Sequence, residues 1–460
     1  MADNSVEEIE REEEDYGLDA ALVGQILDAV DAHDTARLEI LTEPLHAADI
    51  ADLLEQIGPA ERRDLLRLWP RGIDGEVLSE IDESIREEVI EYLPREMLAE
   101  AVRELDSDDV VDLIEDLEQA QQEIILGALD KSDRAAVEQS MAYPEYSAGR
   151  LMQREVVAAP QFWTVGQAID HFRREADDLP ELFFDVYVVD PSYKPVGAVP
   201  ISTLLRSRRD VPLAQIMESL SEIPVDMDQE EVAYIFDKYH LISAPVVEPG
   251  GRLVGQITVD DIVGVIHEES REDILALAGV SDSGRHGGVW DMVASRLPWL
   301  LLNTLTAALA VSVIQGFEAQ IAEVVTLAVL MPIVASLGGN GATQTLTVAV
   351  RALASRELSA VNAVRTVSRE MIVGVVNGVV LAVVTGVAIY LIFGDLRLCV
   401  AFAAAIVINM FVAAAAGALV PLALERMGRD PAVSSAVFVT FVTDFTGFFA
   451  FLGIAALILL

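Results

Sequence analysis

Residues 433–460, VSSAVFVTFVTDFTGFFAFLGIAALILL, form an apolar run that is long enough to cross a bilayer as one helix. Asp444 lies in the middle of this run as its only acidic residue, and the segment contains no cationic partner. A carboxylate at the centre of a membrane helix costs roughly 2.5–3.5 kcal/mol on insertion scales, and such residues usually face water or an ion. The run therefore predicts a membrane helix whose Asp444 binds a transported cation. A protonated, hydrogen-bonded structural aspartate is the alternative.

Four more apolar runs precede this helix, at residues 297–315, 324–350, 371–393 and 398–424, so we expect five transmembrane helices. Positively charged loops of membrane proteins stay in the cytoplasm. We therefore expect a multi-pass protein of the cell inner (plasma) membrane, with the lipid bilayer as a partner, a cytoplasmic N-terminus and an external C-terminus. The arginines that set this orientation lie in two connections, at Arg351, Arg356, Arg365 and Arg369 and at Arg426 and Arg429.

The second apolar run contains an unusual stretch, MPIVASLGGNGATQTLTVAV, at residues 331–350. Its proline and glycines weaken a helix, and several of its side chains are polar. Irregular backbone at membrane depth is tolerated only inside protein or beside a water-filled cavity, and broken helices expose carbonyl oxygens to cations. We expect a broken helix in which Gly338, Gly339 and Asn340 line a pore. Close helix packing through small residues is the alternative.

The net charge, like the hydropathy, differs strongly between the N-terminal and C-terminal parts of the chain. The chain carries 75 acidic and 31 basic residues, for a net charge of −44. Beyond residue 282, nine acids are balanced by nine arginines, so the whole net charge belongs to the preceding part. A polyanionic domain repels nucleic acid and attracts cations or basic partners. The alternative is a solvated surface whose charge serves only solubility.

Residues 18–141 show helical periodicity, with apolar residues at three- and four-residue spacing between polar turns. Segments such as residues 46–69 and 94–105 resemble loosely repeated helix pairs, which predicts a small α-helical solenoid. Within it, Asp108 and Asp112 are spaced i, i+4, so both carboxylates lie on one helix face.

From residue 144 the pattern changes to a duplicated α/β unit. The strand-like segments VYVVD (186–190) and VGAV (196–199) follow a helical stretch, and the same order recurs at residues 230–266. These repeats resemble a tandem pair of cystathionine-β-synthase (CBS) domains. Thr258 and Asp261 match the adenosine-binding pattern of that family, which makes ATP a candidate ligand. The first repeat has Pro200 in place of the threonine, so nucleotide binding stays an open question.

A connecting helix is expected at residues 259–280, after the second repeat. Like charges one turn apart on a helix repel each other, so its crowded acids favour a cationic partner. Mg²⁺, which takes oxygen ligands and is often held by one or two carboxylates, suits this helix. The acids concerned are Asp261, Glu268 and Glu272 on one stripe, with Glu269 and Asp273 as an i, i+4 pair beside it.

Seven further motifs lie in order along the chain: PEYSAGRLM (144–152), DQEEV (228–232), GRLVGQITVDD (251–261), EDI (272–274), QGFE (315–318), GGNGATQT (338–345) and VTDFTG (442–447). Together, over nearly the whole chain, these motifs resemble the MgtE family of magnesium transporters and channels. The resemblance implies a homodimer with five transmembrane helices per subunit and a Mg²⁺-selective pore on the dimer axis, with Asp444 at its ion site. It also implies that cytoplasmic Mg²⁺ closes the pore by bridging the helical domain, the CBS domains and the connecting "plug" helix.

The same resemblance nominates the sensor ligands. His240 and Gly264 occupy positions that are acidic in some relatives, which implies weaker or fewer sensor sites here. The positions that match family sensor ligands are Asp228, Asp261, Glu269, Glu272 and Asp273, with Asp108 and Asp112 as further candidates on the helical domain.

The expected organisation is multidomain: an acidic disordered tail (1–17), a helical domain (18–141), α/β CBS domains (142–206 and 207–268), a plug helix with its linker (269–288) and an all-α pore domain (289–460). No catalytic triad or phosphate-binding loop is evident, so we expect a Mg²⁺-gated Mg²⁺ channel rather than an enzyme. The alternative is a proton- or sodium-coupled divalent-cation transporter in which Asp444 titrates. A third hypothesis is a membrane-anchored sensor that passes no ion; Asp444 and the polar second run argue against it.

Overall fold

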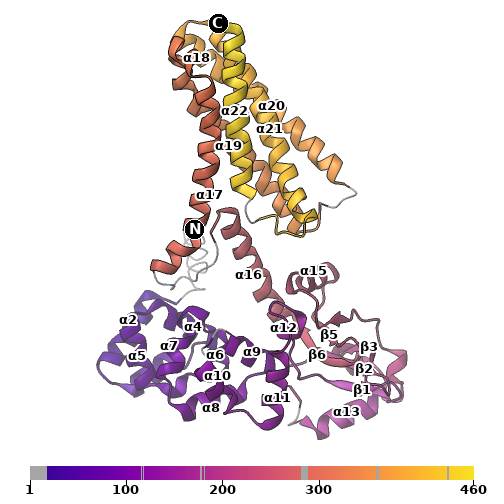
Figure 1. Ribbon diagram of the computed structural model, residues 1–460. Helices are drawn as coiled ribbons and strands as arrows, with labels where there is room; N and C mark the ends of the chain where they lie inside the picture. Colours follow the sequence, from indigo (N-terminus) through magenta and orange to yellow (C-terminus); the bar gives the residue numbers. More distant parts are fainter. Residues whose placement is uncertain are drawn as a thin grey trace, which may run out of the picture. The chain divides into compact units, whose positions relative to one another are not determined.

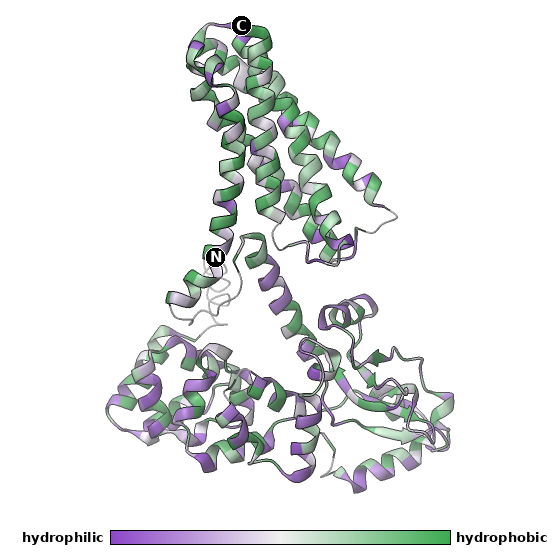
Figure 2. Ribbon diagram, viewed as in Figure 1, coloured by the Kyte–Doolittle hydropathy of each residue, from purple (hydrophilic) through white to green (hydrophobic). Residues whose placement is uncertain are grey.

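A computed structural model describes residues 18–115, 117, 119–176, 179–180, 182–280, 289–358, 362–432 and 435–459. The chain divides into two compact units, Met1–Ile266 and His267–Leu460 (Figure 1). Hydrophilic residues are spread over the first unit, and hydrophobic residues dominate the long helices of the second (Figure 2). The expected acidic tail and residues 281–288 of the expected linker lie outside the described residues.

The first unit begins with the predicted stack of short helices around a continuous core of Leu, Ile and Val side chains. Asp19, Asp34, Asp74 and Asp82 each accept a hydrogen bond from the first turn of the helix that follows. Part of the negative charge therefore caps helices, where carboxylates are stabilising. The helices are α2 (Ala20–Asp31), α3 (Thr35–Thr42), α4 (Ala47–Gln56), α5 (Pro59–Leu68), η1 (Pro70–Gly72), α6 (Gly75–Glu80), α7 (Glu83–Tyr92), α8 (Arg95–Glu104), α9 (Ser107–Glu115), α10 (Gln119–Leu126) and α11 (Lys131–Ser140).

The predicted duplication follows in the same unit as two three-stranded sheets, β1-β2-β3 and β4-β5-β6. In each sheet the first pair of strands is parallel and the second pair antiparallel, with a register shift at the equivalent place, between Val188 and Val189 and between Val246 and Val247. The elements are α12 (Ala148–Leu151), β1 (Ala158–Pro160), α13 (Val165–Arg174), β2 (Asp185–Val189), β3 (Pro195–Pro200), α14 (Ile201–Arg206), η3 (Leu213–Gln215), β4 (Ile223–Pro224), α15 (Gln229–Tyr239), β5 (Ser243–Val247) and β6 (Leu253–Thr258).

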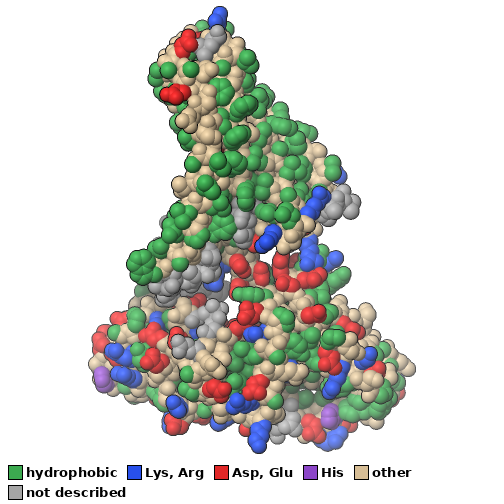
Figure 3. Space-filling view, viewed as in Figure 1, with side chains coloured by type: hydrophobic (Ala, Val, Ile, Leu, Met, Phe, Trp, Pro, Cys, Tyr) green, Lys and Arg blue, Asp and Glu red, His purple; other side chains and the backbone are tan. Residues whose placement is uncertain are grey.

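The connecting helix α16 (Val259–Leu277) starts directly after β6 and runs into the second unit. Among the described residues, five helices are long and apolar enough to cross a membrane, which confirms the predicted number. Hydrophobic side chains cover much of their surface in the face that Figure 3 shows. The helices of this unit are α17 (Val289–Gly316), the short α18 (Glu318–Glu323), α19 (Thr326–Ala354), α20 (Ala363–Phe393), α21 (Leu396–Arg426) and α22 (Ser435–Leu459).

The prediction of a broken second membrane helix is wrong. Helix α19 continues without interruption past its proline and its glycines. A Cβ atom added to Gly338 would lie 2.2 Å from Nδ2 of Asn409 in α21, and one added to Gly341 would lie 2.7 Å from Cε of Met410. The glycines therefore serve close packing between helices, which was the alternative left open. Gly338 is buried in this contact and does not line an exposed surface.

Candidate functional site

A stripe of polar side chains runs along the exposed face of α19. Its members recur at three- and four-residue spacing, so they lie on one side of the helix over three turns. The exposed face of α20, by contrast, is mainly apolar, with side chains such as Val376, Val380 and Val383 that suit lipid, although it includes Asn377. The hydroxyls of Thr343 and Thr347 donate to backbone carbonyls one turn earlier in α19. The exposed amides of Asn340 and Gln344 need partners that hydrocarbon does not supply, so the stripe favours contact with water or protein. The residues of the polar stripe are Ser336, Asn340, Thr343, Gln344 and Thr347.

Asp444 of α22 lies at the depth of this stripe. Asn409 packs against both Gly338 of α19 and Gly447 of α22, so these two glycines are level with each other. Helices α19 and α22 run in opposite directions (Figure 1). A step of three residues back from Gly447 along α22, to Asp444, therefore covers about 4.5 Å in the same direction as a step of three residues forward from Gly338 along α19, to Gly341. The half-buried Asp444 is therefore level with Asn340 and Gly341.

A first acidic cluster forms where α9 packs on the CBS domains; we call it the α9 cluster, and it comprises Asp106, Asp108, Asp109, Asp260 and Asp261. Polar contacts hold α9 against the segment at residues 150–155. The hydroxyl of Ser107 donates to Oε2 of Glu155 at 2.8 Å, and the backbone N–H of Arg154 donates to the Ser107 hydroxyl at 2.8 Å. In addition, Arg150 forms an ion pair of 2.8 Å with Glu115. These contacts bring carboxylates that are about 150 residues apart in the chain into one place.

The acids of the α9 cluster raise one another's pKa. Burial raises the pKa of Asp108 well above its ordinary value, and the neighbouring carboxylates of Asp261, Asp109 and Asp106 raise it further. Burial, with the charges of Asp261 and Asp106, raises the pKa of Asp109 to about 7. Burial also raises the pKa of Asp261 to about 6, although its hydrogen bonds from Thr258 act in the opposite direction. Crowded carboxylates of this kind favour a proton or a cation.

A second acidic cluster lies in the other unit, at the end of α16; we call it the plug cluster, and it comprises Glu269, Glu272, Asp273 and Asp430. Burial raises the pKa of Asp273 to about 6, with further contributions from the negative charges of Asp430, Glu269 and Glu272. The end of α16 is fixed by Ala276 and Leu277, which pack on Leu346 and Val350 of α19. Asp430, in the connection between α21 and α22, is thereby brought to the plug helix.

Known proteins resemble this chain over nearly its whole length. The chain is 33% identical to the magnesium transporter MgtE of Thermus thermophilus over 96% of this chain and 99% of that protein. The chain belongs to the MgtE family of magnesium transporters. It is also 32% identical to magnesium transporter MgtE of Enterococcus faecalis over 70% of this chain and 71% of that protein. Family models match as divalent cation transporter (residues 331–454), MgtE intracellular N domain (45–146) and CBS domain (214–268).

Two of the similar solved structures cover about half of this chain. One is the cytosolic domain of the Mg²⁺ channel MgtE in complex with ATP, with 32% identity, a TM-score of 0.49, and coverage of 53% of this chain and 99% of that chain. Another is the soluble part of a magnesium transporter, with 24% identity, a TM-score of 0.48, and coverage of 54% and 98%. Family membership and the five candidate spans together make this chain a multi-pass membrane protein of a transporter family, not of an enzyme family.

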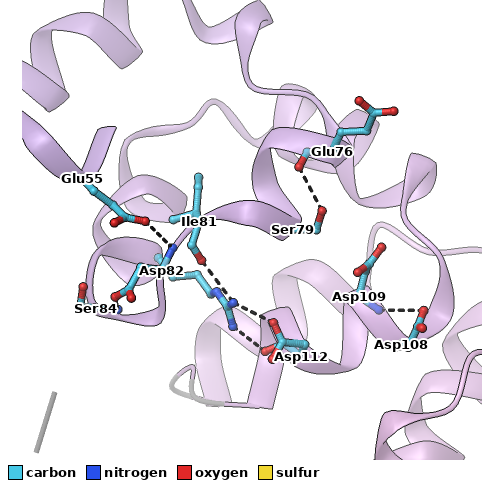
Figure 4. A network of polar contacts seen from close by, with 10 residues as sticks. Glu55, Glu76, Ser79, Ile81, Asp82, Ser84, Asp108, Asp109 and Asp112 are labelled. Carbon is cyan, nitrogen blue, oxygen red and sulfur yellow. Dashed lines mark hydrogen bonds and ion pairs between the residues drawn. The ribbon is translucent and has the colours of Figure 1, made fainter. Parts of the chain in front are cut away.

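The structure groups some of the predicted sensor residues of this MgtE chain and separates others. Asp108 and Asp261 meet in the α9 cluster, and Glu269, Glu272 and Asp273 in the plug cluster. Asp112 is engaged elsewhere: its Oδ2 accepts a 2.7 Å hydrogen bond from the buried guanidinium of Arg86, and Figure 4 shows it apart from Asp108 and Asp109. This ion pair stabilises the helical domain, since Arg86 is otherwise a buried charge.

Two further predicted residues have local partners. Asp228 caps α15, where its carboxylate accepts a hydrogen bond from the backbone N–H of Glu230. The hydroxyl of Thr258 donates to Oδ2 of Asp261 at 2.8 Å, so the two residues predicted for a nucleotide pair with each other. Within the described residues, no three His, Cys, Asp or Glu side chains converge closely enough to enclose a bare metal ion. An ion held through its water shell needs fewer direct carboxylates.

The sequence interpretation missed Asp109 and Asp430 as members of the acidic clusters, and it did not connect Asn409 with the membrane site. Asp109 follows Asp108 directly, so its proximity to Asp261 depends on the rotation of α9 in the folded unit. Asp430 lies in a short basic connection, where Arg429 and Arg426 indicated only membrane orientation. Asn409 lies between two glycines of neighbouring helices, a position that only the packing of three helices reveals.

The raised pKa values predict that protons substitute for a cation in the α9 cluster. The pKa of Asp109 is about 7 and that of Asp261 about 6, both above the unfolded value of about 3.9. A raised carboxyl pKa destabilises the folded arrangement at high pH, and this penalty disappears as pH falls toward the unfolded value. Without Mg²⁺, we expect the melting temperature of the first unit, measured in the full chain, to rise by a few degrees from pH 8 to 5.5.

The measurement is thermal unfolding of the detergent-solubilised protein across this pH range, with and without Mg²⁺. The stabilisation that Mg²⁺ adds should shrink at pH 5.5, because protons and Mg²⁺ compete for the same oxygens. A melting temperature that falls with pH between 8 and 5.5, in the absence of Mg²⁺, would contradict the predicted repulsion.

Proposed function

We propose that this MgtE-family chain is a Mg²⁺-selective channel for magnesium uptake, driven by the electrochemical gradient and closed by cytoplasmic Mg²⁺. The observation that carries the proposal is the level arrangement of Asp444 with the exposed polar stripe of α19. The stripe supplies amide and hydroxyl groups for water, and Asp444 supplies the negative charge. Mg²⁺ is small and loses its water reluctantly, so its hydrated form fits a pathway of water-binding groups and one carboxylate.

A homodimer completes the pathway. In one chain the polar stripe is exposed on the outside of the helix bundle, where it would face hydrocarbon. A second copy placed against the same face, by two-fold symmetry, encloses the stripe and brings two Asp444 side chains toward one axis. The orientation that we propose has the N-terminus in the cytoplasm and the C-terminus outside, as the arginine-bearing connections favour.

The two acidic clusters suit a Mg²⁺ sensor. Each collects carboxylates whose mutual repulsion makes the compact arrangement unfavourable without a cation. Mg²⁺ bound to these carboxylates relieves the repulsion and stabilises the arrangement in which α16 is held. The equilibrium shifts only as far as Mg²⁺ binds the closed state more tightly than the open state. The proposed sensor residues are Asp108, Asp109 and Asp261 in the α9 cluster and Glu269, Glu272, Asp273 and Asp430 in the plug cluster, with Asp228 and Asp112 retained from the family resemblance.

ATP at the CBS domains remains a proposal for this chain. A solved relative is a cytosolic MgtE domain in complex with ATP. Here Thr258 and Asp261 are the residues that match a nucleotide site, but the Asp261 carboxylate also belongs to the α9 cluster. ATP and Mg²⁺ would therefore compete for, or share, one carboxylate.

Ion flux tests the proposed function against the coupled-transporter alternative. A divalent charge that moves through about 100 mV gains roughly 4.6 kcal/mol, twice the value for a unit charge, which is enough to drive entry. We expect Mg²⁺ uptake into vesicles containing the full chain to follow voltage and the Mg²⁺ gradient, with neither Na⁺ nor a pH gradient present. Empty vesicles are the control. Uptake that stops when the pH or Na⁺ gradient is removed at fixed voltage would replace the channel with a coupled transporter.

A further inference from the structure

Asn409 is the most deeply buried amide in the described part of the membrane unit, with 1% of its surface exposed. It projects from α21 between two glycines, one on each neighbouring helix. A Cβ atom on Gly338 of α19 would lie 2.2 Å from its Nδ2, and one on Gly447 of α22 would lie 2.7 Å from the same atom. Nδ2 donates a 3.0 Å hydrogen bond to the backbone carbonyl of Val334 in α19. One side chain thus contacts three helices.

Stability alone does not explain an amide at this place. The Oδ1 atom of Asn409 is buried and accepts no hydrogen bond from a described residue. An unpaired buried acceptor is unfavourable, most of all in a membrane protein where water is excluded. A leucine of similar shape would fill the space without this cost. The amide of Asn409 donates a hydrogen bond to the Val334 carbonyl, whereas a leucine side chain has no donor and cannot form this bond.

The position of this bond connects it to the ion pathway. Val334 and Gly338 are one turn apart on α19, so the amide holds both the rotation and the axial level of that helix. Asn340 and Gly341 follow Gly338 within the next turn of α19. Asp444 lies about one turn before Gly447 on the antiparallel helix α22, and so at the same level. A slide of α19 by one residue would shift the stripe by about 1.5 Å relative to Asp444. The distance between the stripe and Asp444 is thus set through Asn409.

We propose that Asn409 is a positioning residue of the ion pathway: its carboxamide holds α19 against α22 so that Asn340 and Asp444 act on one ion at one level. This inference rests on the proposed function of Asp444 and the α19 stripe. Asn409 touches neither the pathway nor the ion, and its effect passes through the helix that it holds.

The test is Asn409→Leu in the reconstituted full chain, which keeps the volume and removes the donor. We expect folded protein in wild-type amounts, and a half-saturating Mg²⁺ concentration that rises about three- to tenfold, the factor for one lost hydrogen bond. Asn377→Leu is the matched control, because Asn377 is exposed on α20; its half-saturation should stay at the wild-type value. Unchanged half-saturation and maximal rate in folded Asn409→Leu would overturn the proposal, as would a loss of folded protein with normal transport per folded molecule.

A second pair of variants keeps the inference testable if leucine is not tolerated. Gly447→Ala should lower the yield of folded protein, because its Cβ meets the amide. Gly447→Ala combined with Asn409→Ala should restore the yield but leave the half-saturation raised, whereas recovery of both would show a purely structural contact. Asp444→Asn is measured in the same series. If that variant transports normally, the proposed function fails; if it does not and Asn409→Leu is wild-type, this inference alone fails.

Discussion

Asp444→Asn should abolish or severely reduce Mg²⁺ uptake while leaving the five-helix bundle folded. The substitution keeps the shape of the side chain and removes its charge. A hydrogen bond from ion-bound water to a charged group contributes about 1.5–3 kcal/mol, so each lost carboxylate should weaken ion binding by at least roughly tenfold. In the proposed dimer two such carboxylates face one axis, and both are lost together. Folding should not suffer, because removal of a charge from the middle of a membrane helix lowers its insertion cost.

The measurement is uptake of Mg²⁺ into vesicles at fixed voltage, normalised to folded protein. Asp395→Asn is the matched control: Asp395 caps the first turn of α21, a role that asparagine fulfils equally well, so its uptake should equal that of the wild type. Asp444→Glu, which retains the charge on a longer side chain, should keep part of the uptake. Normal uptake by a well-folded Asp444→Asn variant would show that Asp444 is a structural aspartate.

The membrane fold was predictable because its signals are local. Length and apolarity alone identify a span, so all five helices follow from runs such as residues 371–393. The error at α19 has a physical cause as well. Proline and glycine weaken an isolated helix, but Gly338 and Gly341 lie against Asn409 and Met410, and that packing stabilises the helix. Sequence shows the weakness of a helix and not the neighbour that compensates for it.

The candidate sites were predictable only in part, for a similar reason. Asp444 stands out because no other charged residue lies in its apolar run, whereas the acids before residue 282 are too many for charge alone to select among them. What separates Asp108 and Asp109 from Asp112 is the position along α9: the first two lie in its first turn and meet Asp261, and the third lies one turn later and meets Arg86. Asp430 and Asp273 are likewise brought together only by the folded second unit.

Neutralising the acidic clusters should remove the response of the proposed channel to internal Mg²⁺. The variant is Asp109→Asn, Asp261→Asn and Asp273→Asn together, which changes the three acids with pKa values of about 7, 6 and 6. Asparagine keeps the shape, and it removes both the charge that attracts Mg²⁺ and the charge that repels neighbouring acids. The protein without Mg²⁺ should therefore already be more compact, and added Mg²⁺ should change it little. Coupling between an effector and a conformational change is typically about 1–3 kcal/mol, so the threshold for closure should shift by roughly 5- to 150-fold or vanish.

The two readouts are protease protection of the first unit and Mg²⁺ flux, each measured as a function of the Mg²⁺ concentration on the side that carries this unit. The outcome is judged by how steeply each readout changes with Mg²⁺ and not by its absolute level, because the variant without Mg²⁺ is already more compact than the wild type. A control variant removes three exposed acids of the first unit that lie outside both clusters, Asp28→Asn, Glu39→Gln and Asp237→Asn, and so makes the same change in net charge. This control should close at the wild-type Mg²⁺ concentration. If the cluster variant closes there too, the acids of both clusters are a solvated surface, and the sensor must be sought elsewhere in the chain.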